Sequence, residues 1–238
     1  MTVQFAELGY EVKSADYFQC ERHEMLPFIP VDCRRVLDVG CAEGAFGESL
    51  KRLRGIEVWG VEPFHSAAEK AKSKLDWVVE GVFGPELALP EGTFDCILFN
   101  DVLEHLPAPE AALRYARSLL SPEGVVVASI PNIRSFPTIW QLMFHARWEY
   151  QDSGILDRTH LRFFTKSSIV GMFEREGFAL ESIAGINAYL GTPQPSKRLW
   201  TAYKLANAFL AGRIGDMKFL QFAVVAKPTI MVKVPGTC

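Results

Sequence analysis

One stretch decides the fold of this chain: Val36-Leu37-Asp38-Val39-Gly40-Cys41-Ala42-Glu43-Gly44-Ala45-Phe46-Gly47. It has the pattern of an apolar strand that runs through a glycine loop into a helix. Glycine in such a loop lets the backbone approach a ligand closely. Because the first N–H groups of a helix have no partner inside the helix, they attract a carboxylate. The stretch therefore predicts a ligand-binding loop that holds a carboxylate at a helix start.

A nicotinamide dinucleotide site fits this loop poorly. Such a site needs the pattern Gly-x-Gly-x-x-Gly, and the residue two positions before Gly44 is Ala42. Gly44 and Gly47 are therefore present without the first glycine of the pattern. A dehydrogenase remains only a remote alternative.

Outward from this stretch, short β-rich runs alternate with helical patterns, and this alternation predicts a doubly wound α/β fold with a mostly parallel sheet and helices on both faces. The expected strands are Arg35–Val39, Glu57–Val61, Trp77–Glu80, Phe94–Phe99, Val125–Ile130, Phe178–Ile186 and Phe219–Ala226. The expected helices are Asp16–Phe28, Ala45–Leu53, His65–Lys74, Pro109–Leu120, Lys166–Glu176 and Ser196–Leu210.

The length of the chain favours one domain. Its 238 residues are 49% hydrophobic, enough for one sizeable core and few for two. We expect a single domain over residues 1–238, with three additions: an N-terminal helical segment 1–34, an insertion or lid at 132–165, and a helical insertion at 187–216.

The net charge and the cysteine content limit the possible functions of the protein. The formal net charge of −3 provides no field for a polyanion, so no nucleic-acid partner is expected. The N-terminus lacks the pattern of a signal peptide, and no apolar run approaches about 20 residues. The five cysteines form no Cys-x-x-Cys pair, and their odd number disfavours a disulfide framework. These features predict a cytoplasmic protein.

A carboxylate at Glu62 follows the second expected strand, 22 residues after Gly40. An acidic residue at that place in a doubly wound fold can accept hydrogen bonds from both hydroxyls of a ribose. The glycine loop and Glu62 together predict a ligand with a ribose and a carboxylate.

Together, Leu37-Asp38-Val39-Gly40-Cys41-x-x-Gly44 and Val61-Glu62 resemble the class I S-adenosylmethionine-dependent methyltransferase family. Further matching stretches are Phe94–Leu106 and the turn Leu120-Ser121-Pro122-Glu123-Gly124. The resemblance covers about Met25 to Pro131 and the closing strands. It implies S-adenosylmethionine as cofactor and a seven-stranded sheet whose last strand is antiparallel and inserted near one edge.

The same resemblance implies roles for single residues. Asp38, Gly40, Cys41 and Gly44 would lie against the methionine part of the cofactor, and Glu62 would hold the ribose. Asn100 and Asp101 would lie beside the sulfonium. The family often has an acidic residue near adenine where this chain has Val82. Val82 and Phe83 are therefore expected only as walls of the adenine pocket.

A second resemblance concerns the acceptor. Ile130-Pro131-Asn132-Ile133-Arg134 and the run from Gly154 to Thr165 are similar to methyltransferases of polysaccharide and quinone pathways. It implies that residues 132–165 form a lid over the acceptor. Methyl transfer needs an aligned acceptor and removal of its proton. His160, oriented by Asp157, is the first candidate base and His105 the second, and each has a purely structural alternative.

Aromatic and basic residues gather in two segments. Trp140, Phe144 and Trp148 have the spacing of one helical face, near Arg134, Arg147, Arg158 and Arg162. We expect a packed lid core here in preference to an acceptor platform. The helix at Ser196–Leu210 mixes Lys197, Arg198 and Lys204 with apolar residues, and packing onto the core is favoured over peripheral contact with an anionic membrane.

The leading hypothesis is O-methylation of a sugar hydroxyl in glycan or polysaccharide biosynthesis. The alternatives are methylation of a quinone precursor or another small phenolic molecule, and a cofactor-binding module without catalysis. A nucleic-acid methyltransferase is disfavoured because Asn132 follows Pro131, the reverse of an Asn-Pro-Pro-Tyr motif. Nothing in the sequence calls for a metal, and the oligomeric state stays open.

Overall fold

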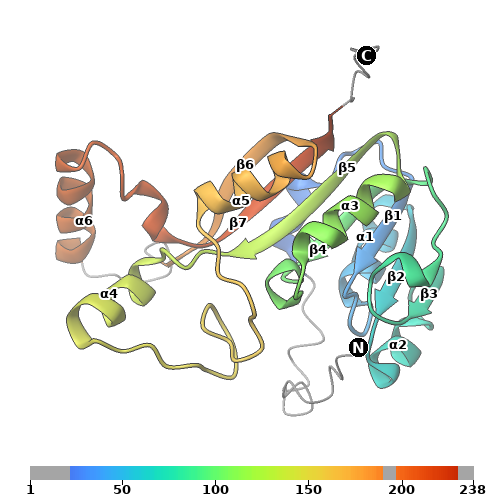
Figure 1. Ribbon diagram of the computed structural model, residues 1–238, viewed down its shortest axis with the longest axis horizontal. Coiled ribbons are helices and arrows are strands. Elements are labelled where there is room, and N and C mark those ends of the chain that lie inside the picture. The colour runs from blue at the N-terminus through green and yellow to red at the C-terminus, as the bar shows by residue number, and fades with distance from the viewer. Residues whose placement is uncertain (1–21, 190–196, 230–238) are drawn as a thin grey trace, which may run out of the picture.

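A seven-stranded sheet organises the chain, with strand order β3-β2-β1-β4-β5-β7-β6 (Figure 1). The computed structural model describes residues 22–189 and 197–229. The strands are β1 (Arg35–Val39), β2 (Glu57–Glu62), β3 (Trp77–Glu80), β4 (Phe94–Asn100), β5 (Leu120–Pro131), β6 (Phe178–Ala188) and β7 (Phe219–Pro228). Only β7 runs antiparallel to its neighbours, β5 and β6. The predicted doubly wound fold, with an antiparallel last strand inserted near the edge, is confirmed.

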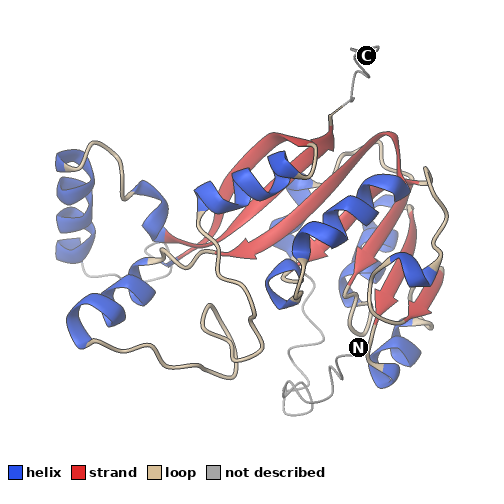
Figure 2. Cartoon of the chain, in the orientation of Figure 1, coloured by secondary structure: helices blue, strands red, loops and turns tan. Residues whose placement is uncertain are grey.

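The α-helices follow the expected alternation (Figure 2). They are α1 (Ala45–Arg54), α2 (His65–Ala71), α3 (Pro109–Leu119), α4 (Phe136–His145), α5 (Lys166–Arg175) and α6 (Lys197–Phe209). Short 3-10 helices are η4 (His23–Phe28), η5 (Pro85–Leu87), η6 (Leu103–His105) and η8 (Gly215–Lys218). Helix α2 is shorter than the predicted helix His65–Lys74. It ends at Ala71, and residues 72–74 form a turn.

Alternating side chains of the central strands build two hydrophobic layers, one on each face of the sheet. In β1, Leu37 and Val39 pack into the layer that α3 and α5 cover. Val36 points to the opposite layer, which contains Phe46 and Leu50 of α1. Because both faces are covered, the central strands are apolar nearly throughout.

The N-terminal segment departs from the prediction. The expected α-helix at Asp16–Phe28 is wrong over its described part, because residues 23–28 form the 3-10 helix η4. Pro27 lies inside this segment and cannot donate the backbone hydrogen bond that a continuing α-helix needs. Arg22, just before η4, has a left-handed backbone with φ 45°. The rest of the expected helix, residues 16–21, lies outside the described residues.

In the segment 132–165, the prediction that Trp140, Phe144 and Trp148 share one helical face is only partly right. Helix α4 ends at His145, and Ala146 follows with a left-handed φ of 51°. Trp148 is therefore beyond the helix, where its ring packs edge-on against Phe163 at a centroid distance of 5.4 Å. Trp140 and Phe144 do share a face of α4, with ring centroids 4.3 Å apart. Both are more than 40% exposed, so the expected packed core of aromatics is wrong.

Helix α6 projects from one end of the sheet, near α4 (Figure 1). Tyr203 is buried and its hydroxyl donates to the carbonyl of Ile214. Leu205 and Phe209 are 67% and 90% exposed, so the expected packing of this helix onto the core is wrong for these two residues. The side chains of Lys197 and Arg198 lie outside the described residues. Within residues 22–189 and 197–229, no helix is both long and apolar enough to cross a membrane.

We predict that Gly60→Ala destabilises the fold by about 1–3 kcal/mol, the usual cost of overpacking a core. A Cβ at Gly60 in β2 would lie 2.5 Å from Sγ of Cys41 and 2.7 Å from Cδ1 of Leu75. Gly84→Ala is the matched control, because its Cβ would meet nothing within 4 Å and its backbone is extended. Urea unfolding of both variants measures the difference. Equal midpoints would show that β2 does not pack against the glycine loop in this way.

Candidate active site

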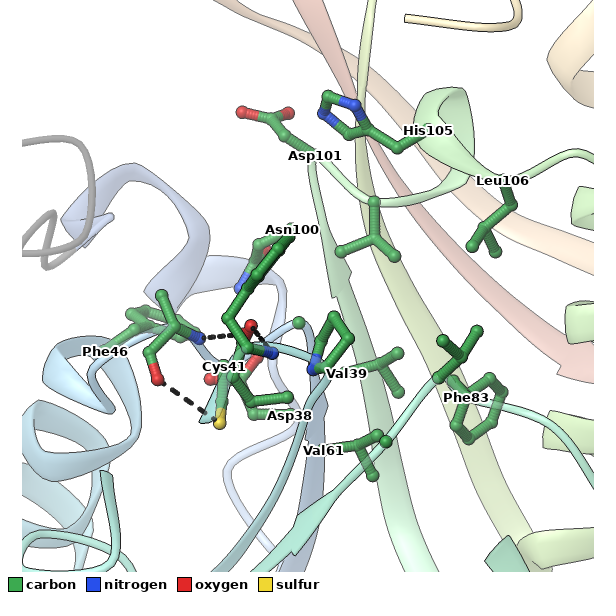
Figure 3. Close-up of a pocket in the computed structure, with 18 of the residues that line it drawn as sticks. Asp38, Val39, Cys41, Phe46, Val61, Phe83, Asn100, Asp101, His105 and Leu106 are labelled. Carbon is green, nitrogen blue, oxygen red and sulfur yellow. Dashed lines mark hydrogen bonds between the residues drawn. The ribbon is translucent and has the colours of Figure 1, made fainter. Parts of the chain in front are cut away.

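A cavity of about 420 Å³ opens where the carboxyl ends of β1, β2 and β4 meet (Figure 3). Ligands of doubly wound sheets bind at this edge because the strand ends and the following loops converge there. All residues expected to contact the cofactor line this cavity except Gly44. They are Asp38, Gly40, Cys41, Glu62, Val82, Phe83, Asn100 and Asp101.

Two glycines shape the loop that follows β1, each in a different way. Gly40 has φ +69° and its N–H donates to the carbonyl of Val61 at 2.8 Å. A Cβ at Gly40 would lie 2.8 Å from Cγ2 of Val102, so only glycine fits. Gly44, also left-handed, faces Ala71 and Leu75 and does not line the cavity. That Gly44 lies against the methionine part of the cofactor stays a prediction; in the structure, its left-handed backbone lets α1 begin close to α2.

Glu62 joins the two turns that border the cavity. Its Oε2 accepts the N–H of Ala42 at 2.8 Å, and its Oε1 accepts the N–H of Phe64 at 3.0 Å. Burial raises the pKa of this carboxyl, while these two backbone donors lower it. Because each carboxylate oxygen has two lone pairs, Glu62 keeps acceptor capacity toward a ligand.

Asp38 is buried at the end of β1 with 3% of its surface exposed. Burial and the neighbouring Glu62 raise the pKa of Asp38 to about 7, and Arg22 opposes the rise. A cationic group in the cavity would favour the ionised form of this carboxyl.

Asn100 provides a direct test of whether a polar ligand fits. Its Nδ2 and Oδ1 are both buried and make no hydrogen bond within the protein, although the residue lines the cavity. An unpaired buried amide costs free energy, so it calls for a ligand that both donates and accepts hydrogen bonds. The ammonium and carboxylate groups of an amino acid meet this requirement.

The other end of the cavity is apolar. Phe83 is buried against the rings of Phe99 and Tyr115, with centroids 5.5 and 5.1 Å away. Val82 is 45% exposed and lines the cavity beside Phe83. Such walls suit a flat aromatic base that packs by shape. The cavity therefore matches a ligand that carries an amino acid at one end and an aromatic base at the other.

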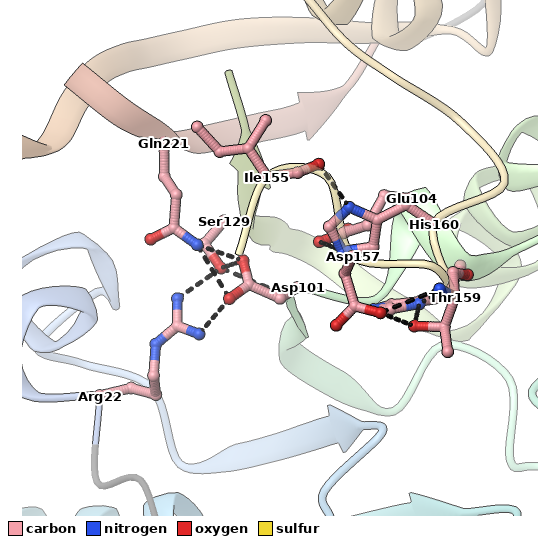
Figure 4. A network of polar contacts seen from close by, with 10 residues as sticks. Arg22, Asp101, Glu104, Ser129, Ile155, Asp157, Thr159, His160 and Gln221 are labelled. Atoms are coloured by element: carbon pink, nitrogen blue, oxygen red, sulfur yellow. Dashed lines mark hydrogen bonds and ion pairs between the residues drawn. The ribbon is translucent and has the colours of Figure 1, made fainter. Parts of the chain in front are cut away.

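A polar network separates this cavity from a second one (Figure 4). Asp101 has a left-handed backbone with φ 55° and binds three side chains. Nε2 of Gln221 donates to both carboxylate oxygens at 2.8 and 2.9 Å, the hydroxyl of Ser129 donates at 2.8 Å, and Arg22 forms an ion pair. Sequence analysis missed Arg22 and Gln221, which lie far from any motif.

The second cavity has a volume of about 600 Å³ and lies between the sheet edge and the segment 132–165. Its walls include Pro137, Thr138 and Gln141 of α4. Asp101 and His105 line both cavities, so the two spaces meet at these residues. No lysine or arginine is among the described residues that line it. The described walls of the second cavity are therefore polar and apolar residues, with the acidic side chains Asp101, Glu104 and Asp157 among them.

Three of the four arginines in the segment 132–165 have structural partners. Arg134 pairs with Asp216 and donates to the carbonyl of Arg213. Arg158 pairs with Asp152. Arg162 donates to the carbonyl of Pro107. These contacts anchor the segment to the rest of the chain.

The three predicted catalytic residues lie close together around the second cavity. Nδ1 of His160 is 2.9 Å from the carbonyl oxygen of Ile155, and Nδ1 of His105 is 3.1 Å from that of Thr159. Asp157 accepts hydrogen bonds from the backbone N–H and the hydroxyl of Thr159 through Oδ1. The carbonyl of Ile155 thus orients the ring of His160, while Asp157 orients Thr159 beneath His105.

Glu104 completes this group and was missed by sequence analysis. It is fully buried, and neither carboxylate oxygen has a hydrogen-bond partner. Burial and the nearby Asp101 raise the pKa of Glu104 well above its ordinary value. Its Oε1 lies 3.9 Å from Nε2 of His160. Its position within Asp101-Val102-Leu103-Glu104-His105, beside a candidate base, was the available signal.

Comparisons with known proteins show which family this chain belongs to. The family model described as a methyltransferase domain matches residues 13–183. The ubiquinone biosynthesis O-methyltransferase of Azorhizobium caulinodans is 28% identical over 174 residues, which cover 69% of this chain and 66% of that protein. The mitochondrial enzyme of the same name from Saccharomyces cerevisiae is 37% identical over 115 residues, covering 44% of this chain and 37% of that protein.

Solved structures share the fold. A SAM-dependent methyltransferase from Archaeoglobus fulgidus superimposes with a TM-score of 0.64 at 22% identity, over 91% of this chain and 95% of that one. The methyltransferase solved with the Haloferax volcanii Trm112 activator gives 0.62 at 15% identity, over 90% and 91% of the two chains. The cavity at the strand ends, the family match and these folds lead to one conclusion: the chain belongs to the methyltransferase domain family and is an S-adenosylmethionine-dependent methyltransferase.

Proposed function

We propose that this enzyme O-methylates a small hydroxylated aromatic acceptor of the quinone-precursor type. The observation that carries the proposal is the second cavity, whose described walls hold no lysine or arginine and which meets the cofactor cavity at His105. A nucleotide-linked or phosphate-bearing sugar would need cationic partners there. The names of the curated relatives, which methylate oxygen in ubiquinone biosynthesis, support the same choice. The phenolic alternative thus replaces the sugar hydroxyl as the leading hypothesis.

The cofactor supplies an electrophilic methyl group on a sulfonium. In our proposal, Asp38 and Asn100 hold its amino-acid end, Glu62 receives the ribose hydroxyls, and Val82 with Phe83 encloses the base. Gly40 and Cys41 provide the close backbone wall beside the amino acid. These assignments use the orphan amide of Asn100 and the raised pKa of Asp38.

In our proposal, the residues where the two cavities meet align the acceptor. His105 lines both cavities, so an acceptor hydroxyl beside it faces the cofactor cavity. We assign proton removal to the buried group around His105, with His160 as its partner from the lid and Asp157 as the residue that orients Thr159. His105 takes precedence over His160, because His160 lines only the second cavity.

We expect affinity for S-adenosylmethionine to rise with pH up to about 7, the pKa of Asp38. Below that pH the carboxyl is protonated, and a cationic ligand must displace the proton, which weakens binding by up to about tenfold per pH unit. Calorimetric titration at pH 5.5 to 7.5 measures this slope. The Asp38→Asn variant should bind S-adenosylmethionine more weakly, and its affinity should depend less on pH because it lacks the titrating carboxyl of Asp38. Identical slopes in both proteins would contradict the assignment.

An acceptor screen tests the proposed function. The purified protein, S-adenosylmethionine and either catechols, simple phenols or nucleotide sugars are incubated, and methylated products are identified by mass spectrometry. We expect methyl ethers of catechols or phenols and no methylated nucleotide sugar, because the described cavity walls offer no cation for a phosphate. Methylation of nucleotide sugars alone would overturn the proposal.

A further inference from the structure

Helices α4 and α6 lie at the same end of the molecule, beyond the sheet, and expose apolar side chains there (Figure 1). Seven large apolar side chains are each more than 40% exposed: Trp140, Leu142, Met143 and Phe144 on α4, Leu205 and Phe209 on α6, and Leu210 just after α6. At about 200 Å² for a fully exposed side chain, they expose about 800 Å² together. An apolar surface of this size marks an interaction site on a soluble protein.

Helix α4 has two different sides. Pro137, Thr138 and Gln141 line the second cavity, so that side is already used. Thr138 is the only buried residue of α4, and the helix contains no charged residue. An uncharged helix with apolar residues on its outer side is normally covered by other protein. The outer side of α4, with Met143 and Phe144 at 69% and 63% exposure, has no such cover within the described chain.

Helix α6 complements α4 in charge. It has no acidic residue and three basic ones, Lys197, Arg198 and Lys204. The residues that follow α4 include one arginine and two exposed acidic residues, Glu149 and Asp152. Packing α6 on another α6 would bring like charges together, whereas packing α6 on α4 brings opposite charges close. The two exposed apolar faces therefore suit each other better than either suits itself.

The two ends of the chain and a membrane are poorer occupants of this surface. The segment 230–238 follows Thr229, which binds Gly177 where β7 ends, whereas α4 and α6 adjoin the end of the sheet where β7 begins. An anionic membrane attracts helices whose apolar face has a basic rim. Glu149 and Asp152, exposed directly after α4, oppose such an attraction.

We propose that two copies of this chain associate, with α6 of each copy packed on α4 of the other. A two-fold axis makes both contacts identical, so the same pair of faces is buried twice. The apolar area of about 800 Å² on each copy equals what one partner contributes to a stable interface of ordinary size. Phe209, 90% exposed at the end of α6, and Phe144 on α4 supply large aromatic anchors.

Sedimentation equilibrium of the full chain at micromolar concentrations tests the association. We expect a dimer, and at least about tenfold weaker association in Phe144→Glu and in Phe209→Glu, because each places a charge inside the apolar contact. Leu53→Glu is the matched control, since Leu53 is 56% exposed but lies on α1. Its association should equal that of the wild type.

An equal mixture of the two variants tests the reciprocal arrangement. A dimer with one Phe144→Glu copy and one Phe209→Glu copy has both substitutions in the same contact, and its second contact is intact. The mixture should therefore associate more tightly than either variant alone. If only one of the two substitutions weakened the dimer, a helix would pack on its own copy, and the reciprocal arrangement would be wrong.

Affinity for S-adenosylmethionine serves as the folding check, because neither Phe144 nor Phe209 lines the cofactor cavity. A wild type that stays monomeric, or variants that both dimerise like the wild type, would overturn the proposal. Cosedimentation of a monomeric wild type with phosphatidylglycerol vesicles, lost in both variants, would assign the surface to a membrane and overturn it as well. The acceptor screen has no bearing on these outcomes, so the two proposals stand or fall separately.

Discussion

The carboxylate of Glu62 holds the active site together. By accepting N–H groups from both Ala42 and Phe64, it ties the glycine loop after β1 to the turn after β2. Gly40 adds a backbone hydrogen bond from the loop to Val61. The position of the cofactor cavity depends on this cross-link, because its walls come from these two turns and from the end of β4. The two backbone donors offset only part of the cost of burying this carboxylate, because burial still raises the pKa of Glu62.

Asp101 lies where the two cavities meet. Its left-handed backbone turns the chain at the end of β4 so that the carboxylate meets Arg22, Ser129 and Gln221. These partners come from the N-terminal segment, β5 and β7, so the network joins distant parts of the chain. Immediately afterwards η6 places Glu104 and His105 beside the second cavity. One residue therefore sets the spatial relation between the two cavities.

The active site contains several buried carboxyl groups, and their surroundings distinguish them. Burial raises the pKa of all three: that of Glu62 despite its two backbone donors, that of Asp38 to about 7, and that of Glu104 well above its ordinary value. Such perturbed groups concentrate at functional sites because charge is missing there until a ligand arrives. The cationic cofactor would supply that charge to Asp38.

The sequence by itself determined the sheet, the glycine loop and the residues of the cofactor cavity, because these depend on local patterns: apolar strands, glycines at tight turns and a carboxylate at a strand end. It failed for the segment 22–28, where Pro27 prevents an α-helix, and for Trp148, which lies beyond the end of α4. Only the tertiary structure brought Arg22 and Gln221 to Asp101 and Glu104 to His160, and only it showed that Arg134, Arg158 and Arg162 bind other parts of the chain or its loops. These contacts join residues that are distant in the chain, and no periodicity or spacing encodes which of them will meet.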